Sequence, residues 1–218
     1  MRIKRTANAG VLLTLDGVTV LLDGVSREIA GYLPTPPSIR KELEETLPDL
    51  VAVTHQHEDH FDIDFARSYH TQPLRPILGP ESLPVEGAHN GAMTLGAVTV
   101  TPVSSRHIGK ASTTTEHLSF ILEGSACVWF LGDASPAQWR GKTQLARPDV
   151  LMVPYAYATT DAAWKMTCDL GAKQIVLLHL PDPGNDPYGL WDAVRAVTGQ
   201  TPENLPLIPA MGETVEIL

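Results

Sequence analysis

Three of the chain's eight histidines lie in one short motif, H-Q-H-E-D-H at 55–60, together with two carboxylates. The motif follows a short, apolar, β-branched run, D-L-V-A-V, which predicts a buried strand. It therefore lies on a loop at a strand end, where α/β sheets usually carry their sites. His55 and His57 are two residues apart, so both imidazoles leave the same side of an extended chain, whereas Asp59 and His60 can face a second centre. This spacing favours a metal site with two ions over one, and both over a solvated polar loop.

Further metal-type side chains stand at other predicted strand ends. His107, Asp133 and His179 each end or follow an apolar run, the runs being 97–103, 126–133 and 174–178. The alternatives are a surface-loop role for His107 and a turn or cap role for Asp133. The remaining histidines look different, because His70 ends a predicted helix and His89 lies in a glycine-flanked turn. We expect both to be structural.

The chain's composition bounds its class. With 218 residues and 43% hydrophobic content, it fits a single domain, residues 1–218, with a full core. The formal charge of −9, without a basic cluster, argues against a nucleic-acid partner. The basic N-terminus imitates a signal peptide, but Asp16-Gly17 interrupts the apolar run that follows it. We expect a cytoplasmic protein without a membrane partner, leave a homo-oligomer open, and take Cys127 and Cys168 as small buried residues.

Strand and helix signals alternate along the chain. Asp16-Gly17 joins two apolar runs and predicts a hairpin over 11–23, after which Asp23 is either a turn residue or part of the site. The glycine- and proline-rich residues 24–37 form a loop long enough to reach over a site. The other expected strands are 49–53, 117–122, 149–153 and 213–217. The expected helices are Ser38 to Leu47 capped by Ser38, 62–69 capped by Asp62, 136–146, one capped by Thr159 or Thr160 and ending before Gly171, and one from Asp186-Pro187 to Gly199.

The motif at 55–60, with G-D at 132–133 and I-V-L-L-H-L-P near the end of the chain, resembles the metallo-β-lactamase superfamily. The spacing through G-D-A-S and V-P-Y-A-Y-A-T-T-D-A-A-W is similar to the branch that contains ascorbate-6-phosphate lactonase. The resemblance implies an α+β fold, an αββα four-layer sandwich of two mixed β-sheets flanked by helices. It covers nearly the whole chain.

The resemblance also implies a ligand set. One metal would be held by His55, His57 and His107. The other would be held by Asp59, His60 and His179, with Asp133 between the two ions. Asp59 and Asp133 would then be the catalytic carboxylates.

The implied cofactor is a pair of divalent ions. Imidazole and carboxylate ligands without thiolate suit Zn²⁺, Mn²⁺ or Fe²⁺, of which zinc is the commonest. A hydroxide between two ions is a nucleophile near neutral pH, so we expect a hydrolase. The di-iron branch usually has glutamate where this chain has His57, and several β-lactamases place a cysteine among the ligands. Both activities are therefore disfavoured.

The expected substrate is a small metabolite with an ester, lactone or amide bond. The alternatives are a phosphodiesterase for a small phosphate ester and a metal-binding protein without turnover. Candidate substrate residues are Tyr32, Arg106, His117 and Tyr155. Arg106, with Lys110 nearby, is the cation closest to a ligand, although either charge could instead be an exposed solubilising one.

Overall fold

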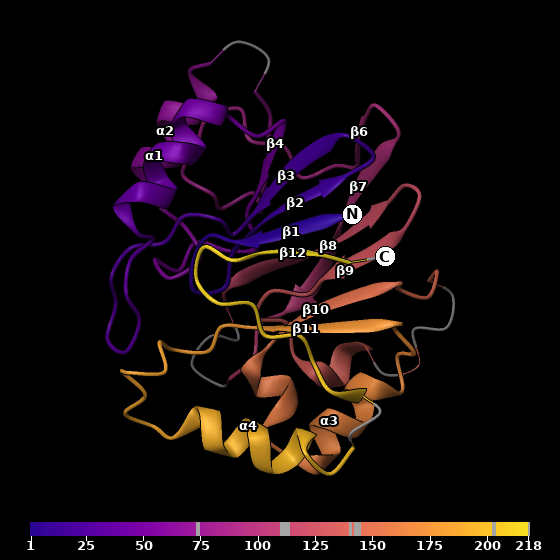
Figure 1. Ribbon diagram of the computed structural model, residues 1–218. Helices are drawn as coiled ribbons and strands as arrows, with labels where there is room; N and C mark the ends of the chain where they lie inside the picture. Colours follow the sequence, from indigo (N-terminus) through magenta and orange to yellow (C-terminus); the bar gives the residue numbers. More distant parts are fainter. Residues whose placement is uncertain (73–74, 110–113, 140, 142–144, 202–203, 218) are drawn as a thin grey trace.

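The computed structural model describes residues 1–72, 75–109, 114–139, 141, 145–201 and 204–217. Two six-stranded sheets pack face to face, with α1 and α2 outside the first sheet and α3 and α4 outside the second (Figure 1). The predicted αββα sandwich of two mixed sheets is confirmed. The helices are α1 (Pro37–Thr46), α2 (Ile63–His70), α3 (Asp161–Cys168) and α4 (Leu190–Thr198).

The first sheet carries the 55–60 motif. Its strand order is β12-β1-β2-β3-β4-β5, antiparallel from β12 to β3 and parallel from β3 to β5. The predicted hairpin is confirmed, because Asp16 and Gly17 have φ values of 49° and 81°, as a two-residue turn requires. The strands are β1 (Arg2–Arg5), β2 (Val11–Leu15), β3 (Val18–Leu22), β4 (Leu50–Ala52), β5 (Ile77–Leu78) and β12 (Thr214–Glu216).

The second sheet has the order β11-β10-β9-β8-β7-β6. It is antiparallel from β6 to β9 and parallel from β9 to β11. The parallel strands are apolar on both faces, because one face meets the other sheet and the opposite face meets helices. The strands are β6 (Met93–Leu95), β7 (Val98–Arg106), β8 (Glu116–Glu123), β9 (Cys127–Phe130), β10 (Val150–Pro154) and β11 (Gln174–Leu178).

Three apolar clusters hold the layers together. The central cluster fills the space between the sheets and includes Leu13, Val100 and Met152, all fully buried. A second cluster lies between the second sheet and helices α3 and α4, and a third lies between the first sheet and helices α1 and α2. The sheets form a rigid platform, and the loops at one end of the strands carry the polar motif.

Several helix predictions hold, and others need correction. Asp62 caps α2 by accepting from Phe65 N, and Thr160 caps α3 by accepting from Ala163 N, as expected. The helix expected over 136–146 is wrong: Pro136–Trp139 forms a short 3-10 helix, and Gly141 has a left-handed φ of 72° that does not continue a helix. Residues 140 and 142–144 of that prediction lie outside the described residues.

Two helix starts differ from the expected ones. Helix α1 begins at Pro37 without a side-chain cap, so Ser38 does not cap it. Helix α4 begins at Leu190, not at Asp186-Pro187. The Asp186 carboxylate instead accepts the N–H groups of Leu190 and Trp191 from a preceding loop, which serves the same capping purpose.

The short strands, the cysteines and the helix lengths can also be compared with the expectations from the sequence. The sequence did not signal strands β1, β5 and β6. Cys127 and Cys168 are thiols that are half-buried, where full burial was expected. In the part of the chain that the structure describes, none of the helices is long and apolar enough to cross a membrane.

Candidate metal centre

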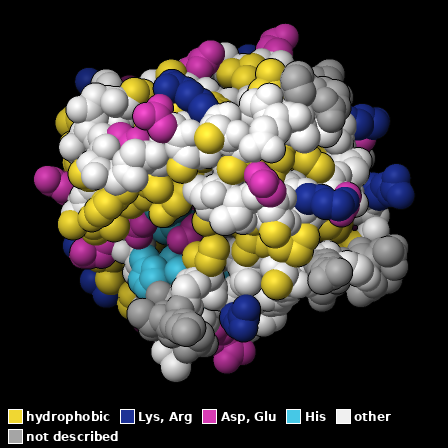
Figure 2. All heavy atoms as spheres, turned by 90° about the horizontal axis from the view of Figure 1, so that it is seen from below, with side chains coloured by type: hydrophobic (Ala, Val, Ile, Leu, Met, Phe, Trp, Pro, Cys, Tyr) yellow, Lys and Arg dark blue, Asp and Glu magenta, His cyan; other side chains and the backbone are white. Residues whose placement is uncertain are grey.

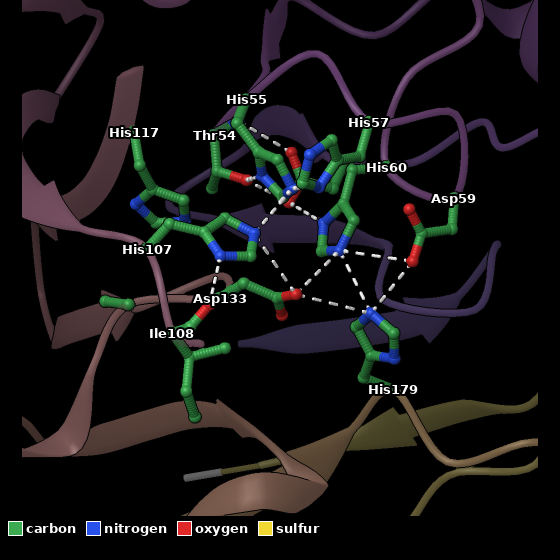
Figure 3. A network of polar contacts seen from close by, with 12 residues as sticks. Thr54, His55, His57, Asp59, His60, His107, Ile108, His117, Asp133 and His179 are labelled. Atoms are coloured by element: carbon green, nitrogen blue, oxygen red, sulfur yellow. Dashed lines mark hydrogen bonds and ion pairs between the residues drawn. The ribbon is translucent and has the colours of Figure 1, made fainter. Parts of the chain in front are cut away.

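The residues singled out as ligands meet at one edge of the sandwich. The 55–60 motif follows β4 of the first sheet, and the other three members follow β7, β9 and β11 of the second sheet. Their imidazole and carboxylate groups point toward a common centre (Figure 3). Figure 2 shows the histidines in a hollow of the surface, beside acidic and hydrophobic side chains. The members are His55, His57, Asp59, His60, His107, Asp133 and His179.

Three imidazoles form a first group. His55 Nε2 lies 2.9 Å from His57 Nδ1 and 3.2 Å from His107 Nε2. The donor atoms of the three residues all lie within 4.8 Å of one another. Two nitrogens bound to one tetrahedral zinc at about 2.05 Å would be roughly 3.3 Å apart, so this spacing suits a shared ion.

A second group contains two imidazoles and a carboxylate. His60 Nε2 lies 3.0 Å from His179 Nε2, and Asp59 Oδ2 lies 3.1 Å from the same His179 atom. The separation between His60 Nε2 and Asp59 Oδ2 is 3.8 Å. These donor atoms also lie within 4.8 Å of one another, close enough for one ion.

Asp133 lies between the two groups. Its Oδ2 is 3.6 Å from His107 Nε2 in the first group, and 3.5 Å and 3.6 Å from His60 Nε2 and His179 Nε2 in the second. Its other oxygen, Oδ1, is buried without a hydrogen-bond partner among the described residues. A buried carboxylate oxygen is rarely left unpaired, and a cation would satisfy it.

Outer partners fix the orientation of the imidazoles. The Asp23 carboxylate accepts hydrogen bonds from the Thr54 backbone N–H and from the Thr54 hydroxyl, each with a length of 2.7 Å. It also lies 2.8 Å from His60 Nδ1. Thr54 Oγ1 is in turn 2.9 Å from His55 Nδ1. Because the Nδ1 atoms then carry the hydrogens, the Nε2 lone pairs of His55 and His60 face the centre.

His107 and His179 also have outer partners. His107 Nδ1 lies 2.6 Å from the Ile108 carbonyl oxygen, which again leaves Nε2 toward the centre. His179 has a left-handed φ of 64°, a conformation that costs a non-glycine residue roughly 1–3 kcal/mol. Asn8 stabilises it twice: its carbonyl accepts the His179 N–H over 3.1 Å, and its side-chain amide lies 3.1 Å from His179 Nδ1.

These outer residues were incompletely predicted. For Asp23 the sequence allows either a turn role or a site role. In the structure its buried carboxylate contacts His60 and, through Thr54, supports His55. Thr54 and Asn8 were not singled out. For Thr54 the signal was its position immediately before the motif, but Asn8 lies far from every ligand in sequence and carried none.

Burial and the carboxylates determine the electrostatics of the cluster. Burial lowers the pKa of His55 well below its usual value and also lowers the pKa of His57, which favours the neutral imidazole that a metal needs. For His60, burial is outweighed by Asp133 and Asp23, and the pKa is raised. For Asp133, burial is outweighed by His179 and His60, so the pKa of the carboxyl is well below its usual range.

Two tyrosines predicted to contact substrate lie beside His179. The Tyr32 ring packs edge-on against the imidazole with centroids 4.9 Å apart, and Tyr155 does so at 5.8 Å. Burial, with the nearby Tyr155, Asp59 and Asp133, raises the pKa of Tyr32. Its hydroxyl therefore stays protonated and can donate a hydrogen bond.

The other two substrate candidates are placed differently. His117 is 2% exposed and packs behind the first group, 5.1 Å from the His55 ring, with Nδ1 2.7 Å from Ser105 Oγ. Burial lowers its pKa to about 3. Arg106 is exposed, and its guanidinium donates to Ser135 Oγ over 3.2 Å. Lys110 lies outside the described residues.

The histidines taken as structural lie apart from this cluster. His70 is the last residue of α2. His89 pairs with Leu78 in a short bridge, where its carbonyl accepts Gly79 N–H. Neither belongs to a candidate ligand group among the described residues.

Solved structures share this fold. A possible metal-dependent hydrolase from Veillonella parvula aligns with a TM-score of 0.75 at 16% identity, covering 100% of this chain and 99% of that one. An isothiocyanate hydrolase from Delia radicum gut bacteria aligns at 0.71 and 15% identity, with 100% and 99% coverage. The metallo-β-lactamase fold protein YhfI from Bacillus subtilis aligns at 0.67 and 17% identity, with 98% of both chains covered. The comparison with curated proteins finds no match.

A family model connects this fold to the chain's own sequence. The β-lactamase superfamily domain matches residues 2–179, which include every member of the cluster. The structural neighbours named as metal-dependent hydrolases share the same two-sheet architecture. The chain therefore belongs to the β-lactamase superfamily, and it carries a histidine and aspartate cluster able to bind metal.

Proposed function

We propose that this protein is a hydrolase that uses a dinuclear metal centre to cleave an ester, lactone or amide bond in a small metabolite. His55, His57 and His107 would hold one ion. Asp59, His60 and His179 would hold the other, and Asp133, which lies between the two groups, would contribute to both. The observation that carries the proposal is the position of Asp133 Oδ2, at 3.5–3.6 Å from imidazole nitrogens of both groups.

The donor set fits two divalent ions. It contains imidazoles and carboxylates without a thiolate, which suits zinc, manganese or iron, and we propose zinc. The unpartnered Asp133 Oδ1 and the close Nε2 pairs are both explained by cations among them. Bound ions would supply a hydroxide near neutral pH and polarise the attacked carbonyl.

The protein's own groups position the reactants. Asp59 and Asp133 flank the centre, where their carboxylates orient a water by accepting its hydrogens. Tyr32 and Tyr155 lie on the His179 side, where a tyrosine hydroxyl can donate to the oxygen that gains charge during attack. The products are a carboxylic acid and an alcohol or amine, because water adds across the acyl bond.

Charge favours a neutral substrate over a phosphate ester. A phosphodiesterase would surround its substrate with several cationic donors. Arg106 instead contacts Ser135, and the chain has a net charge of −9. We propose that the protein binds a small molecule and neither nucleic acid nor a membrane. We also propose that it belongs with the lactonase-like branch of the superfamily.

The test is a substrate panel with zinc, manganese and iron forms of the protein. It contains lactones, carboxylic esters, amides, aryl phosphodiesters, cyclic nucleotides and an isothiocyanate, the last because one fold neighbour hydrolyses that group. Rates are measured from pH 5 to 10, and activity should fall toward acid because protons compete for the ligands and the nucleophile. Tenfold faster turnover of phosphodiesters would replace this proposal with the phosphodiesterase, and no turnover in any metal form would reject catalysis.

A further inference from the structure

An apolar cavity of about 320 Å³ lies next to the His179 side of the metal centre. Three loop segments enclose it, 32–36, 180–183 and 208–211, with Trp191 of α4 closing one side. These segments are distant in sequence and rich in proline. Cavities of roughly 300–1,000 Å³ are the size that small ligands occupy in proteins.

Two residues connect this cavity to the metal centre. Tyr32 lines it, and the same ring packs on His179 at 4.9 Å. Asn8 also lines it, and its amide lies 3.1 Å from His179 Nδ1. A group in the cavity is therefore one side chain away from the proposed second ion, close enough to belong to the same substrate molecule.

The cavity has no cationic side chain among its described lining residues that is free to bind an anion. Its buried cation, Arg5, is 6% exposed and already donates to the backbone carbonyls of Ala7, Asn8, Leu180 and Pro209. The carboxylate of Asp182 also lines the wall, where it accepts the Gly184 N–H. Arg5 therefore joins the loops that form the cavity, and the acidic neighbour disfavours a negatively charged guest.

The mouth of the cavity exposes apolar side chains. Among the described residues, the large hydrophobic side chains that are exposed are Leu33, Tyr188, Leu205 and Met211, and two of them, Leu33 at 53% and Met211 at 38%, line this cavity. Exposed apolar side chains that gather around one groove can mark a ligand-binding site.

We propose that the cavity binds an uncharged apolar acyl group of the substrate, so that the enzyme acts on esters or lactones with a hydrophobic chain or ring of six or more carbons. This inference rests on the proposed hydrolase function. The lower limit on size follows from the volume, since a cavity of roughly 150 Å³ already holds benzene and this one has a volume of about 320 Å³. The orientation follows from Tyr32, which places the apolar group on one side of its ring and the reacting carbonyl on the other.

The first test compares methyl esters from acetate to hexanoate with the zinc-loaded protein in a pH-stat. The methyl leaving group is too small to compete for the cavity. Each added methylene should raise kcat/KM about fourfold, which is the equivalent of about 0.8 kcal/mol. Leu33→Asp should flatten this series, while Leu205→Asp should leave it unchanged, because Leu205 is a similarly exposed leucine outside the cavity lining.

The second test does not depend on turnover. Metal-free protein is titrated with N-phenyl-1-naphthylamine, a neutral apolar fluorophore. Leu33→Asp should weaken its binding at least tenfold, and Leu205→Asp should not. Binding that is sensitive to Leu33, together with no ester hydrolysis in any metal form, would reject the proposed function and leave an apolar binding site.

Two results would overturn the cavity inference while leaving the hydrolase in place. One is a kcat/KM that does not change with chain length. The other is an equal effect of Leu33→Asp and Leu205→Asp on the ester series and on fluorophore binding, since this would reflect general surface hydrophobicity.

Discussion

The Asp23 carboxylate lies 2.8 Å from His60 Nδ1, and through Thr54 it also supports His55. One buried carboxylate thus orients an imidazole in each proposed metal site. Its left-handed φ of 46° turns the chain directly after β3 and places the carboxylate under the ligand loop.

Asp23→Asn should lower zinc affinity about 10- to 100-fold, as expected for loss of an outer partner of a ligating histidine. Asparagine tolerates the left-handed backbone, so the change removes the charge and spares the turn. Asp16→Asn is the matched control, because Asp16 is also at positive φ but lies in the distant hairpin turn. Calorimetric titration with zinc measures both. An unchanged affinity in Asp23→Asn would show that the contact does not support the metal site.

Asp133→Ala should abolish hydrolysis, with kcat reduced by at least about 10³-fold, because the proposed bridge between the two ions is removed. Metal content should fall as well, mainly at the second site. The control is Asp169→Ala at an exposed helix end. Full activity together with full metal content in Asp133→Ala would assign the residue to the turn alone.

Purified or reconstituted protein should contain close to two transition-metal ions per chain by elemental analysis. Chelation should lower the thermal midpoint, since a ligand at a thousand times its Kd stabilises the folded state by about 4 kcal/mol. The metal-free protein should stay folded, because the three apolar clusters do not depend on the ligands. Reconstitution with zinc, manganese and iron that leaves no bound metal would reject the centre.

Tyr32→Phe should lower kcat about 10- to 100-fold with metal content unchanged, because the ring still packs on His179 while the donor hydroxyl is lost. Tyr188→Phe, at a tyrosine that is 74% exposed, is the control. Steady-state kinetics with the best substrate of the panel measures the effect. A change in KM alone would assign Tyr32 to substrate binding, without a role in stabilising developing charge.

Asp62 gives a prediction for stability. It caps α2 and accepts from Arg40 Nη1 over 3.1 Å. Burial works against its charge, but the Phe65 N–H and Arg40 outweigh it, and the pKa is lowered. A carboxyl with a lowered folded-state pKa stabilises the fold above its unfolded value of about 3.9, and this contribution is lost as pH falls through the lower folded value.

Asp62→Ala should therefore cost about 1–2 kcal/mol at pH 7, and the difference from the unaltered protein should narrow below about pH 4. Asp64→Ala, whose side chain is 71% exposed, should cost less than about 0.5 kcal/mol. Urea unfolding at pH 7, 5 and 3 measures both. A difference that stays constant with pH would mean that packing, not charge, carries the effect.

The members of the cluster could be singled out from the sequence because each follows a strand that is apolar enough to be recognised. His107 and His179 were found in this way, although their partners are distant in the chain. The fold class came from the resemblance of these motifs to the metallo-β-lactamase superfamily, and the alternation of strand and helix signals agreed with it. Strand β1 was harder, because its residues R-I-K-R have three cationic side chains around one buried isoleucine and resemble a basic tail.

The supporting residues could not be predicted in the same way. Asn8 contacts a histidine 171 residues further along, and Asp23 acts on one 37 residues further along. The pattern of hydrophobic and polar residues within one segment does not predict a contact between residues so far apart in the sequence. The helix expected over 136–146 was wrong for a local reason. Gly141 has a left-handed φ, and an α-helix cannot continue through that conformation. The cavity also escaped prediction, because its walls come from loops that only the packed sheets bring together.

The cluster draws on both sheets, with the 55–60 motif on one and the remaining members on the other. His60 and His179 are 119 residues apart in sequence, so neither half can bind an ion with full affinity before the sheets dock. Metal capture would then be a late event in folding, and its rate would report on sheet docking. An ion bound there is also a cross-link, which would oppose separation of the two sheets along the edge where the substrate enters.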